Sequence, residues 1–217
     1  AAVDSRAALA ALPVLRKHEL IELQKQQPPF GGLVAARWGQ VGRVFASPGP
    51  IYEPEGRNPD YWRTARALFA AGFRAGDLAH NSFSYHMTPG AWILESGLLA
   101  LGCSVFPAGV GQTEQQAQAM AYLQPQGYVG TPSFLRILLE KVDELGFEIP
   151  ALTKALVSGE AFLPPVREAL AGRGIAGYQA YATADLGVIA YETAARDGLV
   201  VDEEVIVEIV RPGTGDP

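Results

Sequence analysis

The chain has 217 residues, of which 48% are hydrophobic and 18% are charged, a composition typical of a globular protein with a real core rather than of a disordered one. Its formal net charge of −6 argues against a general nucleic-acid binder. There is no run of 18 apolar residues and no charged-then-apolar leader, so we expect no membrane partner and a cytoplasmic location. The single cysteine, Cys103, excludes an internal disulfide framework and reads as a small buried hydrophobic residue.

The N-terminal part of the chain consists of short segments. Residues 1–30 are predicted to form a helical lead-in. Leu33–Ala36 and Val41–Ala46 are short apolar runs and are predicted to be strands. Ser47–Asp60 contains four prolines and two glycines, and it is therefore predicted to be a loop.

Short strands and helices alternate through the middle of the chain. Apolar residues recur at helical spacing in Tyr61–Ala71. His80–Glu114 then runs from a polar-aromatic loop through an apolar helix to a strand and a glycine-rich turn. Thr113 and Thr131 are residue types that favour the N-terminal caps of helices. This alternation predicts an α/β fold, a doubly wound and mainly parallel sheet with helices on both faces.

The last part of the chain has a different pattern. Val188–Thr193, Leu199–Val201 and Val205–Val210 are predicted to be antiparallel strands. We therefore expect an α/β domain over residues 1–187 and the start of a smaller β-rich subdomain over residues 188–217. The chain begins without methionine and stops in a turn directly after a predicted strand, so we expect it to be part of a longer protein.

Two loops are the first candidates for the walls of a binding site. Ligands of doubly wound domains bind beyond the carboxyl ends of the strands. Ala79–Met87 and Pro107–Thr113 follow predicted strands. The chain has three histidines, none at the spacing of a metal site, so no zinc centre is expected.

Five segments carry a resemblance to a known family. In chain order they are HNSFSYHMTPGAW, FPAGVGQTEQQ, GYVGTPSFLRILLEK, ALVSGEAFLPPVREAL and YATADLG. Together they resemble the phenylacetate–CoA ligase branch of the adenylate-forming superfamily, also called the acyl-CoA synthetase superfamily. The likeness extends from about Pro13 to the end of the chain, and its specificity comes from the order of all five segments.

The resemblance implies a ligase reaction in two halves. A carboxylic acid attacks the α-phosphate of ATP to give an acyl-adenylate and pyrophosphate, and coenzyme A then displaces AMP. The implied cofactors are ATP or AMP, Mg²⁺ and coenzyme A, and the implied partner is a small-molecule carboxylic acid. Family members often pair, so a homodimer is a further expectation.

The first nucleotide motif of the family follows a strand. Its glycine-alanine-glutamate pattern matches Ser158, Gly159 and Glu160. Glycine at this place lets the backbone approach the purine. For Glu160 two interpretations remain open, a contact with the nucleotide and a cap on the following helix.

The second nucleotide motif of the family is a tyrosine-glycine-x-hydroxyl-glutamate pattern. It falls on Tyr181, Ala182, Thr183, Ala184 and Asp185. The resemblance implies that the tyrosine stacks on adenine and that the aspartate is a catalytic Mg²⁺ ligand. Alanine at the hydroxyl position and a shorter acid at the metal position depart from the family, so the aspartate could instead hydrogen-bond a loop.

The acyl side of the site is implied by loops. Phe83, Tyr85 and His86 fall where the family lines its acyl pocket, and Gly109 and Gly111 match a family loop beside it. The resemblance implies that His86 orients the carboxylate, whereas a histidine bonded to a backbone carbonyl is the alternative.

The phosphate loop is the main departure from the family. Where the family has a run of Ser, Thr and Gly with a lysine, this chain has Ser47–Gly56, which contains three prolines and two glutamates. Prolines remove backbone N–H donors, and carboxylates repel a triphosphate. From the resemblance we expect the family's C-terminal domain, with its catalytic lysine, to be absent from this chain. The first hypothesis is thus an acyl-CoA ligase-like enzyme. The second is a degenerate, non-catalytic binding protein, and a third is acyl transfer from an activated acid.

Overall fold

A computed structural model of the protein describes residues 3–213, and the predicted turn at Arg211–Pro217 therefore lies partly outside the described residues. The chain forms two compact units, the first ending at Gly56 and the second beginning at Arg57. The first unit contains α1 (Arg6–Ala10), α2 (Glu19–Gln26), a 3-10 helix η1 (Trp38–Gln40), β1 (Arg43–Ser47) and β2 (Ile51–Glu55).

The predicted proline-rich loop is in fact largely a hairpin. β1 and β2 pair antiparallel from Arg43 opposite Glu55 to Ser47 opposite Ile51. The loop prediction for this segment was wrong because alternate residues of β2 are buried and paired. Glu53 bonds Lys17 at 2.9 Å, and Glu55 bonds Arg43 at 2.7 Å. The predicted strand at 33–36 is not formed.

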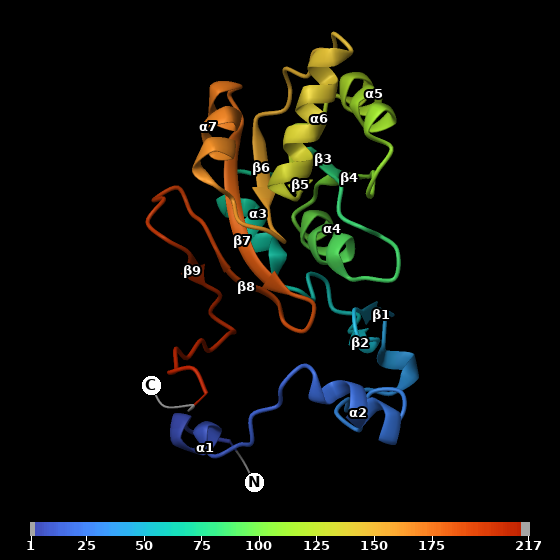
Figure 1. Cartoon of the computed structure of the whole chain (residues 1–217), viewed down its shortest axis with the longest axis vertical. Coiled ribbons are helices and arrows are strands. Elements are labelled where there is room, and N and C mark those ends of the chain that lie inside the picture. Colours follow the sequence, from blue (N-terminus) through green and yellow to red (C-terminus); the bar gives the residue numbers. More distant parts are fainter. Residues whose placement is uncertain (1–2, 214–217) are drawn as a thin grey trace. The chain divides into compact units, whose positions relative to one another are not determined.

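The second unit contains one seven-stranded sheet. The strand order is β4-β3-β5-β6-β7-β8-β9, and the pairs from β4 to β7 are parallel while β7–β8 and β8–β9 are antiparallel. Its elements are α3 (Thr64–Ala70), β3 (Leu78–Asn81), α4 (Gly90–Ala100), β4 (Ser104–Pro107), α5 (Thr113–Leu123), β5 (Gly127–Gly130), α6 (Pro132–Glu144), β6 (Lys154–Val157), α7 (Pro164–Gly172), β7 (Ala176–Thr183), β8 (Gly187–Tyr191) and β9 (Val200–Val201). The predicted α/β class with a mainly parallel sheet is confirmed (Figure 1).

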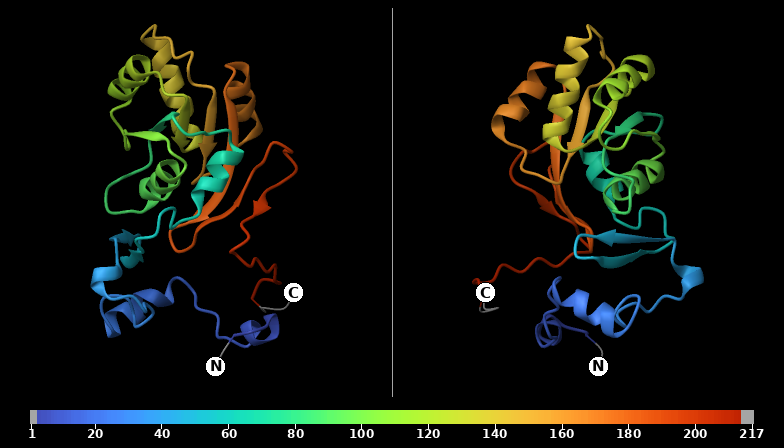
Figure 2. Two further views of the ribbon diagram at one scale, coloured as in Figure 1. Left: turned by 180° about the vertical axis from the view of Figure 1, so that it is seen from behind. Right: turned by 45° about the vertical axis from the view of Figure 1, so that its right-hand side comes forward.

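The helices of this unit form two groups. α3 packs on α4, whereas α6 packs on both α5 and α7. Crossover connections between parallel strands are right-handed, so the reversal of strand order at β3 sends α4 to one face of the sheet and α5 to α7 to the other. Figure 2 shows the sheet and its helices from two further directions.

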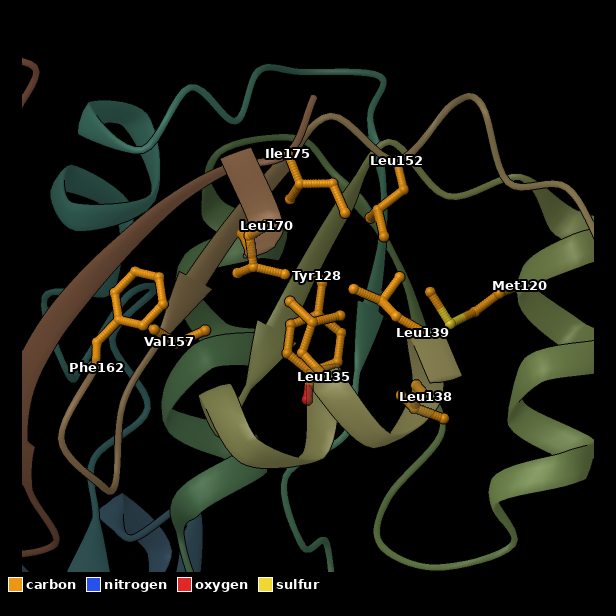
Figure 3. Close-up of a cluster of buried hydrophobic side chains, with 11 residues drawn as sticks. Met120, Tyr128, Leu135, Leu138, Leu139, Leu152, Val157, Phe162, Leu170 and Ile175 are labelled. Atoms are coloured by element: carbon orange, nitrogen blue, oxygen red, sulfur yellow. The ribbon is translucent and has the colours of Figure 1, made fainter. Parts of the chain in front are cut away.

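One buried cluster lies between the sheet and α5 to α7. It is built from side chains of α5, β5, α6, β6 and α7 and of the segments before β6, α7 and β7 (Figure 3). Tyr128, Leu135 and Leu138 are fully buried in it. Because these residues come from strands and helices that alternate in sequence, the core fixes where the strands end and the site loops begin. The members of the cluster are Met120, Tyr128, Leu135, Leu138, Leu139, Leu152, Ala155, Val157, Phe162, Leu170 and Ile175.

The helix starts differ slightly from the predicted ones. α3 begins at Thr64 rather than Tyr61, because the Asp60 carboxylate accepts from the backbone N–H of Thr64 at 2.7 Å and thus caps the helix there. Thr131 caps α6 as predicted, accepting from the Phe134 N–H at 3.3 Å. The predicted cap of α5, Thr113, is instead its first helical residue.

The C-terminal strands continue the same sheet. β8 and β9 match two of the three predicted antiparallel strands, whereas no strand forms at 205–210. Asp202 is buried and pairs with Arg63 at 3.2 Å, which ties this region to the start of α3. A Cβ at Gly187 would lie 2.6 Å from the Trp62 carbonyl oxygen, so only glycine lets β8 start here. Across residues 3–213, we find no helix with the length and apolar character needed to cross a membrane.

Candidate functional site

The candidate site lies beyond the carboxyl ends of the parallel strands. The loop after β3 leads to α4, whereas the loop after β5 leads to α6 on the opposite face. Diverging connections of this kind leave a crevice in which doubly wound proteins bind ligands. The two sets of residues that sequence analysis assigned to the nucleotide and to the acyl group approach each other near this crevice.

A pocket of about 410 Å³ unites most of the predicted nucleotide residues. It brings the loop after β6 to the end of β7, two segments that α7 separates in the chain. Its lining residues are Ser158, Gly159, Glu160, Ala161, Gln179, Ala180, Tyr181, Ala182 and Leu199. Gln179 and Leu199 were not singled out from the sequence. The alternation of side chains along a strand could have indicated Gln179, two residues before Tyr181.

The loop Ser158–Glu160 is fixed by hydrogen bonds on both sides. The Ser158 backbone N–H donates to the Gly130 carbonyl oxygen at 3.1 Å, and its hydroxyl donates to the Ala180 carbonyl oxygen at 2.8 Å. Gly159 has φ of +85°, a conformation that other residues adopt only with strain. The loop therefore holds its backbone at the floor of the pocket.

Glu160 caps a helix, but not the one that follows it. Its Oε1 accepts from the backbone N–H of Ser133, in the first turn of α6, at 2.7 Å. Hydrogen bonds from Ser133 and, more weakly, from Thr131 lower the pKa of the Glu160 carboxyl. The alternative of a cap on α7 was wrong, because the spatial neighbour of this loop is the preceding helix. The carboxylate still lines the pocket.

Tyr181 lies on β7 beyond the point where β6 ends. β6 pairs with β7 only as far as Val157 opposite Gln179. Between Tyr181 and Ala182 the register with β8 shifts, a bulge of the kind that re-aims side chains. The Tyr181 side chain is 56% exposed at the pocket wall, so its ring is available for stacking.

The remaining residues of the second motif lie at the turn from β7 to β8. Thr183 ends β7, and its Oγ1 accepts from the Leu186 N–H at 3.2 Å. Asp185 is exposed in the turn, and neither residue lines the pocket. The described residues contain no cluster of three or more His, Cys, Asp or Glu side chains that could hold a metal. Mg²⁺ commonly uses one or two carboxylates together with substrate phosphates, so Asp185 is of the residue type that could supply one ligand, although it lies outside the pocket lining.

Phe83 links the acyl-side loop to the nucleotide-side loop. A Cβ placed on Gly159 would lie 3.5 Å from the Phe83 ring, and one placed on Gly90 would lie 3.6 Å from it. The ring therefore sits between the first turn of α4 and the floor of the pocket. Two groups of residues predicted for different parts of a ligand thus meet at a single aromatic side chain.

Tyr85 and His86 face different surroundings. The Tyr85 hydroxyl donates to Glu95 Oε2 at 2.6 Å and accepts from Asn81 Nδ2 at 3.0 Å. Burial and the neighbouring Glu95 raise the pKa of Tyr85 far above its ordinary range. His86 is exposed, and its backbone N–H bonds the Ser84 hydroxyl at 3.2 Å.

The glycine-rich turn after β4 is held by a buried amide. Gln116 Nε2 donates to the carbonyl oxygens of Gly109 and Gly111, at 2.9 and 2.7 Å, and Gln116 Oε1 lies 2.8 Å from His80 Nε2. A Cβ on either glycine would meet nothing within 4 Å. The turn is thus rigid on its inner side and open on its outer side. Gln116 was not singled out from the sequence, and no motif signals its contact with His80.

Known proteins to which this chain is clearly similar include CoA ligases. The phenylacetate-coenzyme A ligase of Aromatoleum evansii is 30% identical over 99% of this chain and 51% of its own length, and that of Thermus thermophilus is 29% identical over 96% and 49%. The solved 2-hydroxyisobutyryl-CoA ligase in complex with 2-HIB-AMP has a TM-score of 0.81 and 26% identity over 91% of this chain and 45% of its own. The anthranilate CoA ligase AuaEII, at 16% identity and a TM-score of 0.60, shares the fold. No protein-family model matches the chain.

These relatives define the class of the chain. Its curated relatives and its structural neighbours are CoA ligases of the adenylate-forming superfamily, and the chain shares their fold. Within that class its curated relatives are phenylacetate-coenzyme A ligases, and the chain spans about half of their length. The resemblance stated from five sequence segments is thereby confirmed.

Proposed function

We propose that the protein of which this chain is part activates a small carboxylic acid as an acyl-adenylate, with ATP and Mg²⁺, before transfer to coenzyme A. The observation that carries the proposal is the 410 Å³ pocket in which Ser158–Glu160 meet Tyr181 and Ala182. Two motifs that the family uses for its nucleotide thus form one cavity. The solved ligases that share this fold were crystallised with acyl-adenylates and with CoA.

In this proposal the residues of the pocket and of the adjoining turn from β7 to β8 have different roles. The exposed ring of Tyr181 stacks on the adenine, and the backbone of Gly159 approaches the purine edge. Asp185 contributes one carboxylate to Mg²⁺, which neutralises charge on the phosphates. Thr183 holds the turn that presents Asp185 through its bond to Leu186.

The acyl group is proposed to lie on the other side of Phe83. Its position against Gly159 supports an acyl pocket directly beside the nucleotide pocket, as an acyl-adenylate requires. His86 is proposed to orient the carboxylate, and the open side of Gly109 and Gly111 to border the acyl chain. An aromatic acid and a small aliphatic hydroxy acid are both candidates, since the relatives include ligases for each.

One observation favours the second candidate, a binding protein without ATP turnover. The segment at the family's phosphate loop is a hairpin whose turn contains Pro48 and Pro50, and Glu53 and Glu55 are buried in ion pairs. Such a segment offers few N–H donors to a triphosphate. In this reading the adenine pocket is retained and the phosphate chemistry is lost.

Nucleotide binding tests the pocket itself. AMP titrated into the protein by calorimetry should bind, and Tyr181→Ala should weaken binding by roughly 5- to 150-fold, because stacking of a base on an aromatic ring contributes ~1–3 kcal/mol. Tyr122→Ala is the matched control, because Tyr122 is 88% exposed on α5. Equal affinity of the Tyr181→Ala variant and the unaltered protein would contradict the assigned role of Tyr181.

A further inference from the structure

The polar end of Tyr85 is entirely engaged within the protein. Its hydroxyl donates to Glu95 on α4 and accepts from Asn81 at the end of β3. The side chain is half-buried, and the Trp92 ring packs edge-on against it at 5.1 Å between centroids. A phenol with both a donor and an acceptor partner has little capacity left for a ligand. Any effect of Tyr85 on a ligand must therefore pass through the residues that its hydroxyl contacts, Asn81 and Glu95.

Asn81 is the fixed point of this arrangement. It is fully buried, and every polar atom of its amide is used. Its Oδ1 accepts from the Phe83 N–H at 3.1 Å, and its Nδ2 donates to the Ala91 carbonyl oxygen and to the Tyr85 hydroxyl, both at 3.0 Å. One side chain thus binds the start of the loop, its middle and the helix that follows it.

The backbone of the loop is tied to the same helix. Trp92 Nε1 donates to the Tyr85 carbonyl oxygen at 3.4 Å, and the Ala91 N–H donates to the Ser84 carbonyl oxygen at 3.3 Å. Beyond these bonds the tip of the loop is exposed at His86 and Met87, and Met87 has φ of +60°. The loop therefore has an anchored base and an exposed tip.

We infer that Asn81, Tyr85 and Glu95 form a clamp that positions Phe83, and that Tyr85 is a positioning residue for acid selectivity. Glu95 and Asn81 hold the Tyr85 hydroxyl, and Asn81 also holds the Phe83 backbone, so the Phe83 ring is kept against Gly159. By holding Phe83 against Gly159, the clamp sets the distance between the acyl side and the nucleotide side of the site. Its effect on selectivity rests on the proposed function, whereas its effect on the loop does not.

Deletion of one oxygen atom tests the clamp. In Tyr85→Phe the amide hydrogen exchange of residues 82–88 should become roughly ten-fold faster, because a hydrogen bond to a charged acceptor is lost. Glu95→Leu should have the same effect, while Glu95→Gln, which keeps an acceptor oxygen, should stay near the unaltered rate. Tyr122→Phe is the matched control on an exposed tyrosine. Unchanged exchange in both Tyr85→Phe and Glu95→Leu would overturn the clamp.

Acid selectivity distinguishes a positioning role from a purely structural one. In the full-length protein, Tyr85→Phe should change the ratio of kcat/KM between an arylacetic and a short aliphatic acid by at least about five-fold, while the KM for ATP stays unchanged, and Glu95→Gln should preserve both. An unchanged ratio despite faster loop exchange would overturn the selectivity role. If the unaltered protein activates no acid, the proposed function fails, whereas faster loop exchange in Tyr85→Phe still supports the clamp.

Discussion

His80 is a buried histidine whose protonation state follows from its neighbour. Both amide hydrogens of Gln116 are used by the carbonyl oxygens of Gly109 and Gly111, so Gln116 Oε1 accepts and His80 Nε2 must carry the proton. Burial lowers the pKa of His80 below its usual value, against a smaller opposing effect of the Gln116 bond. The folded protein therefore holds this ring neutral.

Stability should depend on pH through His80. The unfolded chain binds a proton near pH 6.5 and the folded chain only at lower pH, so the stabilising effect is complete above about pH 6.5 and is lost as the pH falls from there toward the lowered pKa. We expect the free energy of unfolding to fall by up to ~1.4 kcal/mol per pH unit below pH 6.5. Urea denaturation between pH 5 and pH 8 measures it. His80→Gln should remove this dependence and His18→Gln, at an exposed site, should not; an identical slope in His80→Gln would contradict the assignment.

At the residue scale, the sequence predicted which motifs belong together but not how single side chains are used. Ser158–Glu160 and Tyr181 were assigned to one nucleotide site from motif resemblance, and they line one pocket. The bond from Glu160 to Ser133 joins residues 27 apart, and that from His80 to Gln116 joins residues 36 apart. Contacts of this range depend on how helices dock on the sheet, which local sequence patterns do not specify.

The packing of α3 on α4 depends on a residue without a side chain. A Cβ at Gly97 would lie 2.1 Å from Thr64 Oγ1 and 2.7 Å from the Ala65 nitrogen. Thr64 is fully buried, and its hydroxyl donates to the Ile93 carbonyl oxygen at 2.8 Å. Glycine at position 97 thus allows the two helices to touch at the backbone.

Alanine substitutions at two glycines distinguish the cost of close helix packing from the effect of a more flexible backbone. Gly97→Ala should destabilise the protein by ~1–3 kcal/mol, the usual cost of overpacking. Gly172→Ala, at the end of α7 where a Cβ meets nothing within 4 Å, should be neutral or stabilise by up to ~1 kcal/mol. Thermal unfolding of both variants gives the comparison. Equal effects of the two substitutions would contradict the close approach of α3 and α4.

At the element scale, prediction succeeded where hydrophobic periodicity is strong. α6 begins where the cap at Thr131 was predicted, with proline at its first position. β2 was missed because Pro54 and two glutamates are rare in strands. Pro54 is tolerated because β2 belongs to a two-stranded sheet with an open edge, and Glu53 and Glu55 are tolerated because each has a cationic partner.

At the scale of the whole molecule, the chain contains the pocket lined by Ser158–Glu160 and Tyr181, and it spans about half the length of its curated relatives. Its larger unit provides the sheet, both groups of helices and all the candidate site residues. The hairpin at the position of the phosphate loop belongs to the smaller unit. Binding of a nucleotide and turnover of ATP need separate tests, and one experiment must address turnover directly.

That experiment is acid-dependent release of pyrophosphate from ATP and Mg²⁺ by the full-length protein, with a panel of aryl, arylacetic and short aliphatic acids. The proposed ligase function predicts release with one class of acid, and its strong reduction in Asp185→Ala. No release with any acid, from a protein that still binds AMP, would contradict the ligase function and favour a nucleotide-binding protein whose phosphate segment no longer supports catalysis.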